Sequence, residues 1–254
     1  MRLPRRLRHG EEATLVEHLD ELRSRLIVCI GAVVVCTIFA FAFQHRILNW
    51  LSQPLPENRQ HLLTLGVAEP FITTFKVSLW VGLGLALPIV LWQLWSFLAP
   101  AIAEGTQRTV ASFVIFSTAL LVAGVAFAYY LVLPKALSFL THYNDQFFNI
   151  QIRASDYYNF VLLVLVGVGI VFELPIFVLA LVRLGIVTSG KLRKTRRVGY
   201  FIVAIVAVLL PGIDPVTTTL EAIPLFVLYE GSIWLAVFFE RRWQRSGDLA
   251  SAVE

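Results

Sequence analysis

The chain has 254 residues, of which 57% are hydrophobic and 15% are charged, whereas about 25% of residues are charged in an ordinary soluble domain. This shortage of charge excludes a soluble fold, and the five histidines and two cysteines show no metal-ligand spacing. No charged residue lies between Lys76 and Glu104 or between Arg108 and Lys135. Each stretch exceeds the ~18 apolar residues that mark a membrane-spanning helix. We therefore predict an all-α, polytopic membrane protein.

The first predicted element precedes the membrane. Residues 1–25 are expected to form a cytoplasmic segment that includes a short amphipathic helix on the membrane surface, because Thr14 and Glu17 match a capping box and leucines recur at helical spacing. Glu21 would lie at the boundary between water and lipid. Two interpretations stay open for it: an ordinary i,i+4 pair with Arg25, or a carboxylate presented to a cationic ligand.

A single transmembrane domain is predicted at 26–239, followed by a cytoplasmic tail at 240–254. Pro175 lies in its fourth apolar run and is expected to kink that helix, because proline removes a backbone donor. The last two spans are predicted to be short, and the thirteen apolar residues at 198–210 would rise only ~20 Å, well below a hydrocarbon core of ~30 Å. The six expected spans are 26–44, 77–99, 109–133, 160–182, 198–212 and 220–239.

The Lys and Arg residues are distributed unevenly between the two sides of these spans. Sixteen of the 21 fall in alternate segments that include both termini, so the positive-inside rule places both termini in the cytoplasm. The long segments on the other side, 45–76 and 134–159, are expected to fold over the outer surface. The net charge of +4 is then explained by topology and by anionic lipid rather than by nucleic acid.

Acidic residues lie within or beside the predicted spans, and two of them, Glu221 and Glu230, interrupt the last apolar run. Glu173 would lie near mid-membrane, where an ionised carboxyl is costly, so it is either a functional group or a protonated group bonded to a neighbouring helix. Glu230 is a second intramembrane carboxyl. Asp214 precedes the last span and is expected to be its N-cap.

Motifs spread over the chain resemble those of the TatC family, the multi-spanning receptor of the twin-arginine protein translocase. The resemblance implies a concave, glove-like bundle of six helices. Its structural positions correspond here to Pro54, Pro70, Phe71, Pro88 and Pro175. The motifs are HLDELRSRL at 18–26, SQPL at 52–55, VAEPF at 67–71, LPIVLWQLWSFLAPA at 87–101, AFAYYLVLP at 126–134, VFELP at 171–175, LRKTRR at 192–197 and IDPVTTTLEAIPLFVLYE at 213–230.

The resemblance also implies a cytoplasmic site that binds the paired arginines of signal peptides. By motif, Glu21 is the first carboxylate of this site, with Leu22 and Arg23 beside it. Gln93 and Phe97 match positions that line the family's groove.

One site position departs from the family pattern. The second site carboxylate of the family falls at Thr106 in this sequence, and the nearest acidic residue is Glu104. Either Glu104 substitutes for it, or the second arginine is contacted differently. The resemblance places the docking region for partner helices near Asp214, where Thr217 and Thr218 supply hydroxyl groups.

Together these features predict a non-enzymatic receptor without a cofactor, located in the bacterial plasma membrane. It would bind twin-arginine signal peptides of folded precursors, nucleate the translocation site and assemble with TatA- and TatB-type single-span proteins and with other copies of itself. The proton-motive force would drive export, since the sequence contains no nucleotide-binding Gly-rich loop. The alternative is a proton-coupled secondary transporter that uses Glu173. An intramembrane hydrolase is disfavoured because no histidine lies within the spans.

Overall fold

The computed structural model describes residues 15–56, 62–98, 107–148, 150–210 and 214–251. In these ranges the chain is predominantly helical and forms no strand, apart from an isolated parallel β-bridge between Leu63 and Arg153. The predicted all-α fold class is therefore confirmed. Five helical segments in the described part are long and apolar enough to cross a membrane: 18–42, 69–97, 111–142, 154–183 and 215–241.

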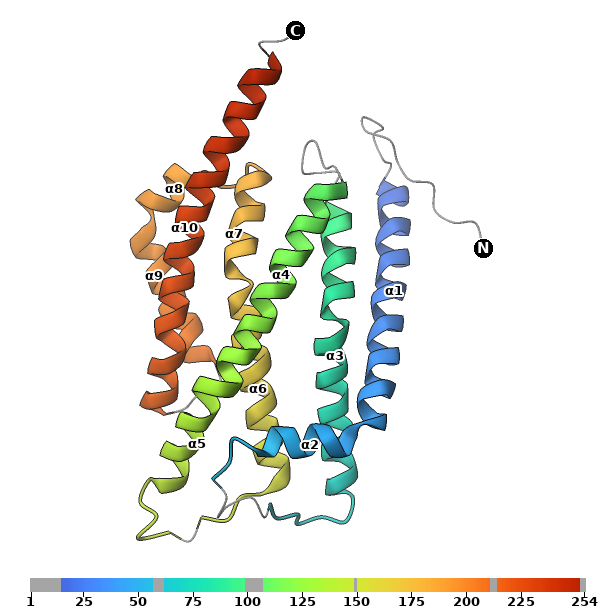
Figure 1. Ribbon diagram of the computed structural model, residues 1–254, viewed down its shortest axis with the longest axis vertical. Helices are drawn as coiled ribbons and strands as arrows, with labels where there is room; N and C mark the ends of the chain where they lie inside the picture. Colours follow the sequence, from blue (N-terminus) through green and yellow to red (C-terminus); the bar gives the residue numbers. More distant parts are fainter. Residues whose placement is uncertain (1–14, 57–61, 99–106, 149, 211–213, 252–254) are drawn as a thin grey trace. The chain divides into compact units, whose positions relative to one another are not determined.

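Figure 1 shows the helices in chain order. They are α1 (Leu15–Ala42), α2 (Gln44–Ser52), α3 (Glu69–Leu98), α4 (Gln107–Phe127), the π-helical turn η3 (Ala128–Val132), α5 (Leu133–His142), α6 (Ala154–Phe172), α7 (Leu174–Arg183), α8 (Ser189–Lys194), α9 (Arg196–Leu209) and α10 (Pro215–Ser251).

The predicted fifth span corresponds to α9, which is as short as the sequence indicated. Its 14 residues rise only about 21 Å at 1.5 Å per residue, so a count of six spans stays a prediction. The helix that contains the predicted sixth span, α10, is longer than that span and runs from Pro215 to Ser251, with its candidate membrane span at 215–241. The helix begins at Pro215, and proline is favoured at the first position of a helix. Glu221 and Glu230 interrupt the apolar run but do not interrupt the helix.

The chain divides into two compact units. The first comprises residues 1–44 and 78–118 and therefore contains α1, most of α3 and the first part of α4. The second comprises residues 45–77 and 119–254 and contains the remaining helices.

In the first unit, α1 and α3 approach closely at a glycine. A Cβ atom added at Gly82 would lie 2.5 Å from the Cα atom of Thr37, so only glycine fits at this position without moving the backbone. Trp95 of α3 is almost fully buried, and its ring packs against that of Phe113 in α4 with centroids 5.0 Å apart. These contacts hold three helices of the first unit together.

The helix α1 is continuous from Leu15 to Ala42. The segment expected to form a separate surface helix before residue 26 is instead the first part of this long helix. The residues of the expected capping box are Thr14, which lies outside the described residues, and Glu17, whose side chain is not described. Polar residues do not end a helix as long as the backbone hydrogen bonds continue, which is why the apolar run alone underestimates its length.

In the second unit, two prolines alter the helices that contain them. Helix α6 ends at Phe172, and α7 begins at Leu174 with Pro175 at its second position, so the expected break at Pro175 is confirmed. Pro134 follows the π-helical turn η3, where the N–H of Leu133 bonds to the carbonyl of Ala128. The wider turn accommodates a proline that cannot donate to the preceding turn.

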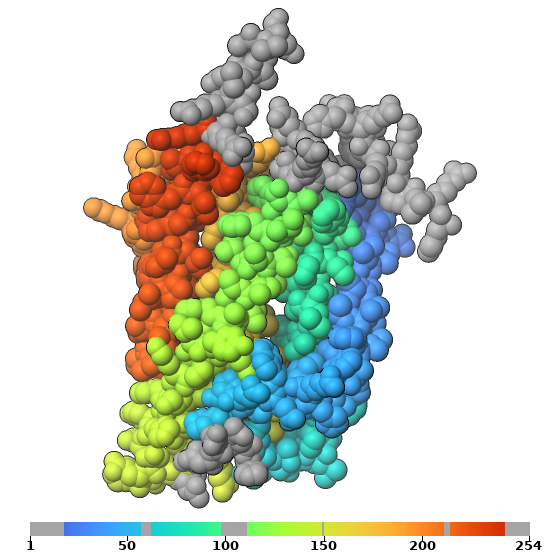
Figure 2. All heavy atoms as spheres, viewed as in Figure 1, coloured from blue at the N-terminus to red at the C-terminus, as the bar shows by residue number. Residues whose placement is uncertain are grey.

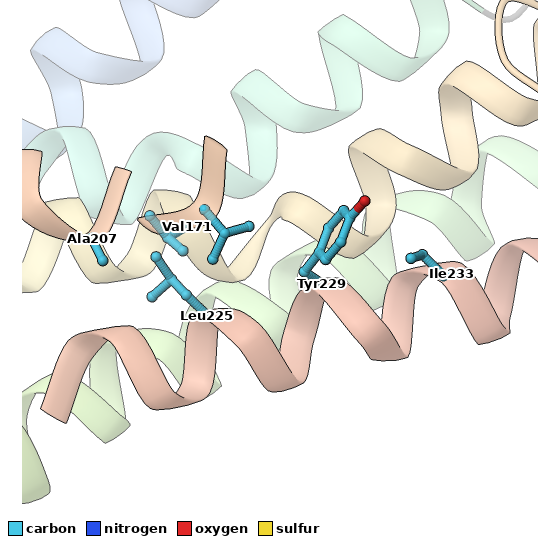
Figure 3. Close-up of a cluster of buried hydrophobic side chains, with 6 residues drawn as sticks. Val171, Ala207, Leu225, Tyr229 and Ile233 are labelled. Carbon is cyan, nitrogen blue, oxygen red and sulfur yellow. The ribbon is translucent and has the colours of Figure 1, made fainter. Parts of the chain in front are cut away.

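The core of the second unit lies along α10. Its buried cluster comprises Val171, Val203, Ala207, Leu225, Tyr229 and Ile233, from α6, α9 and α10. Figure 3 draws the six side chains of this cluster and labels five of them. Helix α10 also packs against α7 and α8. A Cβ at Gly199 of α9 would overlap the hydroxyl group of Tyr229, so this glycine allows the two helices to approach.

The two segments predicted to fold over the outer surface are joined to each other. The backbone of Leu63 bonds to that of Ile152 at 2.9 Å and of Ala154 at 2.8 Å. The hydroxyl of Tyr129 donates to the carbonyl of Trp50 at 2.6 Å, and the hydroxyl of Tyr157 donates to the carbonyl of Leu51 at 2.7 Å. Figure 2 shows α2 lying against the surface formed by η3 and α5. These bonds give the long segments a fixed fold.

Candidate functional site

Glu21 and Arg25 form an ion pair on α1. Arg25 donates from Nε at 2.9 Å and from Nη2 at 2.5 Å to the same carboxylate oxygen, Oε1 of Glu21. The side chain of Glu21 remains 25% exposed and that of Arg25 remains 22% exposed. The expected i,i+4 pair is therefore present at the position where the sequence also indicated a ligand-binding carboxylate.

The guanidinium of Arg25 also reaches α3. Its Nη1 atom donates to Oε1 of Gln93 at 3.2 Å and, more weakly, to the carbonyl of Gln93 at 3.4 Å. Its Nη2 atom lies 3.3 Å from the carbonyl of Ser96. Ser96 is in the last turn of α3, whose carbonyls lack intrahelical donors. Gln93 and Ser96, which follow Arg25 by 68 and 71 positions in the sequence, thus contact its guanidinium.

An aromatic pair lies beside this ion pair. The rings of His18 and Phe97 stack with centroids 4.6 Å apart and planes inclined by 24°. Leu22 and Arg23 are exposed on the same helix, α1. The structure therefore brings Glu21, Gln93 and Phe97 into one unit. Sequence reasoning did not single out His18, although it opens the HLDELRSRL motif one turn before Glu21.

The acceptors gathered here suit a guanidinium. They are the carboxylate of Glu21, the side-chain amide oxygen of Gln93 and the main-chain carbonyls of Gln93 and Ser96. A guanidinium presents five N–H donors in a planar fork and can satisfy acceptors in several directions, whereas an ammonium group concentrates its three donors at one atom. The geometry can hold an arginine side chain, and the arginine held in this structure is Arg25.

Two of the predicted site residues, Glu104 and Thr106, lie outside the described residues. Their position relative to Glu21 is therefore a prediction from the family motif.

The intramembrane carboxyls belong to the second unit, whereas Glu21 belongs to the first. Glu173 is buried at the junction of α6 and α7, where its backbone carbonyl accepts bonds from Ile176 and Phe177, each at 3.1 Å. Glu230 accepts a hydrogen bond from the hydroxyl of Tyr200 and lies 3.4 Å from Nη2 of Arg196. Glu230 therefore joins α10 to α9, which is a structural role.

The N-cap predicted for the last helix is confirmed. Oδ1 of Asp214 accepts the backbone N–H of Thr217 at 2.8 Å, and Oδ2 accepts its hydroxyl at 2.5 Å. Thr217 is fully buried, so its hydroxyl serves the cap and is not available to a partner helix in this structure. Thr218 is half-buried and Thr219 is exposed.

A buried carboxyl that sequence reasoning noted only as an interruption of the last span is Glu221. It is fully buried, and neither of its carboxylate oxygens has a hydrogen-bond partner among the described residues. It lies on the buried stripe of α10 that also contains Thr217 and Leu225. The sequence shows that Thr217, Glu221 and Leu225 recur at intervals of four and so share one face of the helix. This spacing does not reveal whether that face is buried.

Four of the five residues predicted to have structural roles occupy a turn or the start of a helix, and the fifth, Pro88, lies in a helix interior. Pro54 lies in the turn after α2, and Pro70 is the second residue of α3. Phe71 is 65% exposed. Pro88 lies inside α3, and Pro175 is the second residue of α7.

A further ion pair, between Glu69 and Arg153, was not expected from the sequence. Arg153 Nε donates to Oε1 of Glu69 at 2.8 Å and its Nη2 donates to Oε2 at 3.1 Å. Oε2 of Glu69 also accepts the backbone N–H groups of Leu65 and Gly66. The hydrogen bond to Glu69 raises the pKa of Arg153 further above its ordinary value, so this guanidinium stays charged. The pair fixes the start of α3 to the segment before α6.

The chain is similar to known proteins over most of its length. A family model described as "TatC: Sec-independent protein translocase protein (TatC)" matches residues 17–224. A relative from Carboxydothermus hydrogenoformans, named Sec-independent protein translocase protein TatC, is 36% identical over 228 residues, which cover 89% of this chain and 94% of the relative. A protein of the same name from Escherichia coli (strain K12) is 35% identical, with 92% of this chain and 90% of that protein covered.

Solved structures show the same likeness. One, described as the crystal structure of the twin arginine translocase receptor TatC in DDM, matches with a TM-score of 0.77 and 34% sequence identity, covering 86% of this chain and 99% of that chain. Another crystal structure of the same receptor matches with a TM-score of 0.75 and covers 87% of this chain.

Proposed function

Because the chain belongs to the TatC family of Sec-independent protein translocase proteins, we propose that it is the receptor subunit that binds the twin-arginine signal peptides of folded precursor proteins. It is a multi-pass membrane component of a protein translocase. The protein in the matching crystal structure is described as the twin arginine translocase receptor, and this likeness supports the same role for this chain.

The observation that carries the proposal is the acceptor set on α1 and α3. Glu21, Gln93 and Ser96 direct their oxygens at one guanidinium. An arginine of a signal peptide presents the same group, and a charge-assisted, multidentate contact gives it both affinity and geometric specificity. Exposed Leu22, next to Glu21 on α1, and the ring of Phe97, next to Ser96 on α3, would contact the signal beside its arginines.

The second arginine requires another acceptor. We assign it to the segment after α3 that contains Glu104 and Thr106, and Glu104 supplies the carboxylate. The basis is the family motif, in which a carboxylate follows this loop's proline.

The membrane arrangement follows from the charges. Both termini lie in the cytoplasm, since sixteen of the 21 Lys and Arg residues fall on that side. The membrane is the bacterial plasma membrane, and the proton-motive force drives export after the signal has bound. The chain assembles with TatA- and TatB-type proteins and with other copies of itself. Their single helices dock beside α9 and α10, near Asp214 and the incompletely buried Thr218.

A matched pair of variants tests the site. Glu21→Gln removes the charge that pairs with a guanidinium, while Asp20→Asn removes the neighbouring charge, whose side chain is exposed. We expect Glu21→Gln to weaken the binding of a fluorescent peptide with two adjacent arginines about tenfold or more, as for loss of a charged hydrogen bond, and Asp20→Asn to leave it unchanged. Anisotropy titration of the full chain in nanodiscs measures both. Equal affinity of Glu21→Gln and wild type would remove Glu21 from the site.

A further inference from the structure

The acceptors assigned to a signal arginine are already occupied. Arg25 places three of its nitrogens within hydrogen-bond distance of Glu21, Gln93 and Ser96. The contact set is larger than an i,i+4 pair on a helix surface needs, because two of its partners are on α3. The side chain therefore lies in the acceptor set as a bound arginine would.

The charge at the site supports the same interpretation. Among the described residues, Glu21 is the only carboxylate that forms an ion pair with Arg25, so the pair is neutral while Arg25 remains there. A peptide with two arginines gains little attraction from a neutral pair, and a second guanidinium beside the first is repelled. Binding at Glu21 therefore requires that Arg25 leave.

Arg25 has a route by which to leave. Its side chain is 22% exposed and that of Glu21 is 25% exposed, so water reaches both groups. An arginine side chain is long and its charged end is readily solvated at a membrane boundary. The exchange replaces one set of charge-assisted hydrogen bonds with an equivalent set, so its cost is small compared with leaving the Glu21 carboxylate unpaired.

Building on the proposed receptor function, we propose that Arg25 is a resident ligand of the guanidinium site and that a signal arginine binds by displacing it. The protein's own arginine then sets the threshold that a signal must exceed. The apparent affinity is the intrinsic affinity reduced by the fraction of molecules in which Arg25 has left. A peptide that passes this threshold needs contacts beyond the exchanged guanidinium, such as its second arginine and its apolar segment.

Displacement has a quantitative signature. A resident competitor lowers the affinity of every ligand of the same site by the same factor. Removing Arg25 therefore strengthens the binding of a paired-arginine peptide and of a paired-lysine peptide equally, and their affinity ratio stays constant. A residue that only positions Glu21 has the opposite effect, since its removal weakens binding and reduces the preference for arginine.

The experiment measures three peptides, with paired arginines, paired lysines or paired glutamines, against the full chain in nanodiscs. The variants are Arg25→Gln, which removes the charge, and Arg25→Lys, which keeps the charge but loses the planar fork. We expect Arg25→Gln to bind the arginine and lysine peptides about fivefold more tightly, the factor for a partly exposed ion pair of about 1 kcal/mol. Arg25→Lys should gain less, and the glutamine peptide should not change.

A cation on another element provides the control for charge alone. Arg193 is exposed on α8, and Arg193→Gln should change none of the three affinities. Size-exclusion profiles and helical circular dichroism report whether each variant is folded, and Arg25→Lys keeps the test valid if Arg25→Gln is not.

The outcomes separate the two proposals. Suppose that the wild type prefers the arginine peptide and that neither Arg25 variant binds this peptide more tightly than the wild type does. The displacement proposal is then wrong, and the receptor function stands. If the wild type binds the arginine and glutamine peptides equally, both proposals are wrong. A parallel gain for arginine and lysine peptides supports displacement.

Discussion

At the scale of single residues, the acidic side chains of this chain have distinct roles that their positions alone do not distinguish. Glu21 faces an arginine at a partly exposed site, Glu230 joins two helices, and Asp214 caps one. Of these three, Glu21 alone combines access to water with an arginine that also reaches a second helix's carbonyl groups. This combination is the reason to assign ligand binding to Glu21 rather than to Glu230 or Asp214, whose contacts join and cap helices.

The cap at Asp214 leads to a prediction about stability. Asp214→Ala removes both acceptors of Thr217 and should lower the free energy of unfolding by about 1 kcal/mol. Asp214→Asn keeps one acceptor for the backbone N–H of Thr217 and should lose less. Thermal unfolding in detergent compares them. If both variants unfold like the wild type while translocation is lost, Asp214 acts on a partner helix rather than as a cap.

Only part of the candidate site could be predicted from the sequence, residue by residue. The pairing of Glu21 with Arg25 follows from helical periodicity, because residues four apart share a face. Gln93 and Phe97 were identified only through the family motif, since contacts between residues about 70 positions apart depend on how α1 and α3 pack. Ser96 contributes a backbone carbonyl, so its side-chain type carries no signal. The burial of Glu221 also depends on tertiary packing.

At the scale of helices, apolar runs located the described spans but not their ends. Helix α1 begins before the apolar run, α3 begins at Glu69, and α10 continues past the predicted limit of 239. Hydropathy identifies the segments that can lie in lipid, whereas a helix extends as far as its backbone hydrogen bonds continue. The break at Pro175 was predictable because a missing N–H acts locally.

Alanine substitutions at two glycines of α3 test whether the site depends on close packing of α1 against α3. A Cβ at Gly82 would meet the backbone of Thr37, whereas a Cβ at Gly84 would meet nothing within 4 Å. Gly82→Ala should cost about 1–3 kcal/mol by forcing the helices apart and should also weaken binding of the arginine peptide. Gly84→Ala should not destabilise, because alanine favours a helix more than glycine does. Chemical unfolding and peptide titration measure both effects, and equal behaviour of the two variants would contradict this packing.

At the scale of the whole molecule, the fold class and family follow from patterns that extend over the entire chain. Scarce charge, long apolar runs and motifs from 18 to 230 agree with the all-helical structure and with the family match. Topology rests on the distribution of Lys and Arg, which is a statistical consequence of insertion rather than of packing. The proposed receptor role requires that the Glu21 site and incoming signals be on the same side of the membrane.

Site-specific photocrosslinking in inside-out membrane vesicles tests this role most directly. One crosslinker replaces exposed Leu22, beside Glu21, and another replaces exposed Phe147, in the segment predicted to lie outside. We predict that position 22 captures a precursor with paired arginines, captures the paired-lysine precursor at least several-fold less, and that position 147 captures neither. Equal capture of both precursors at position 22, or capture of the arginine precursor only at position 147, would contradict recognition of signal arginines at Glu21.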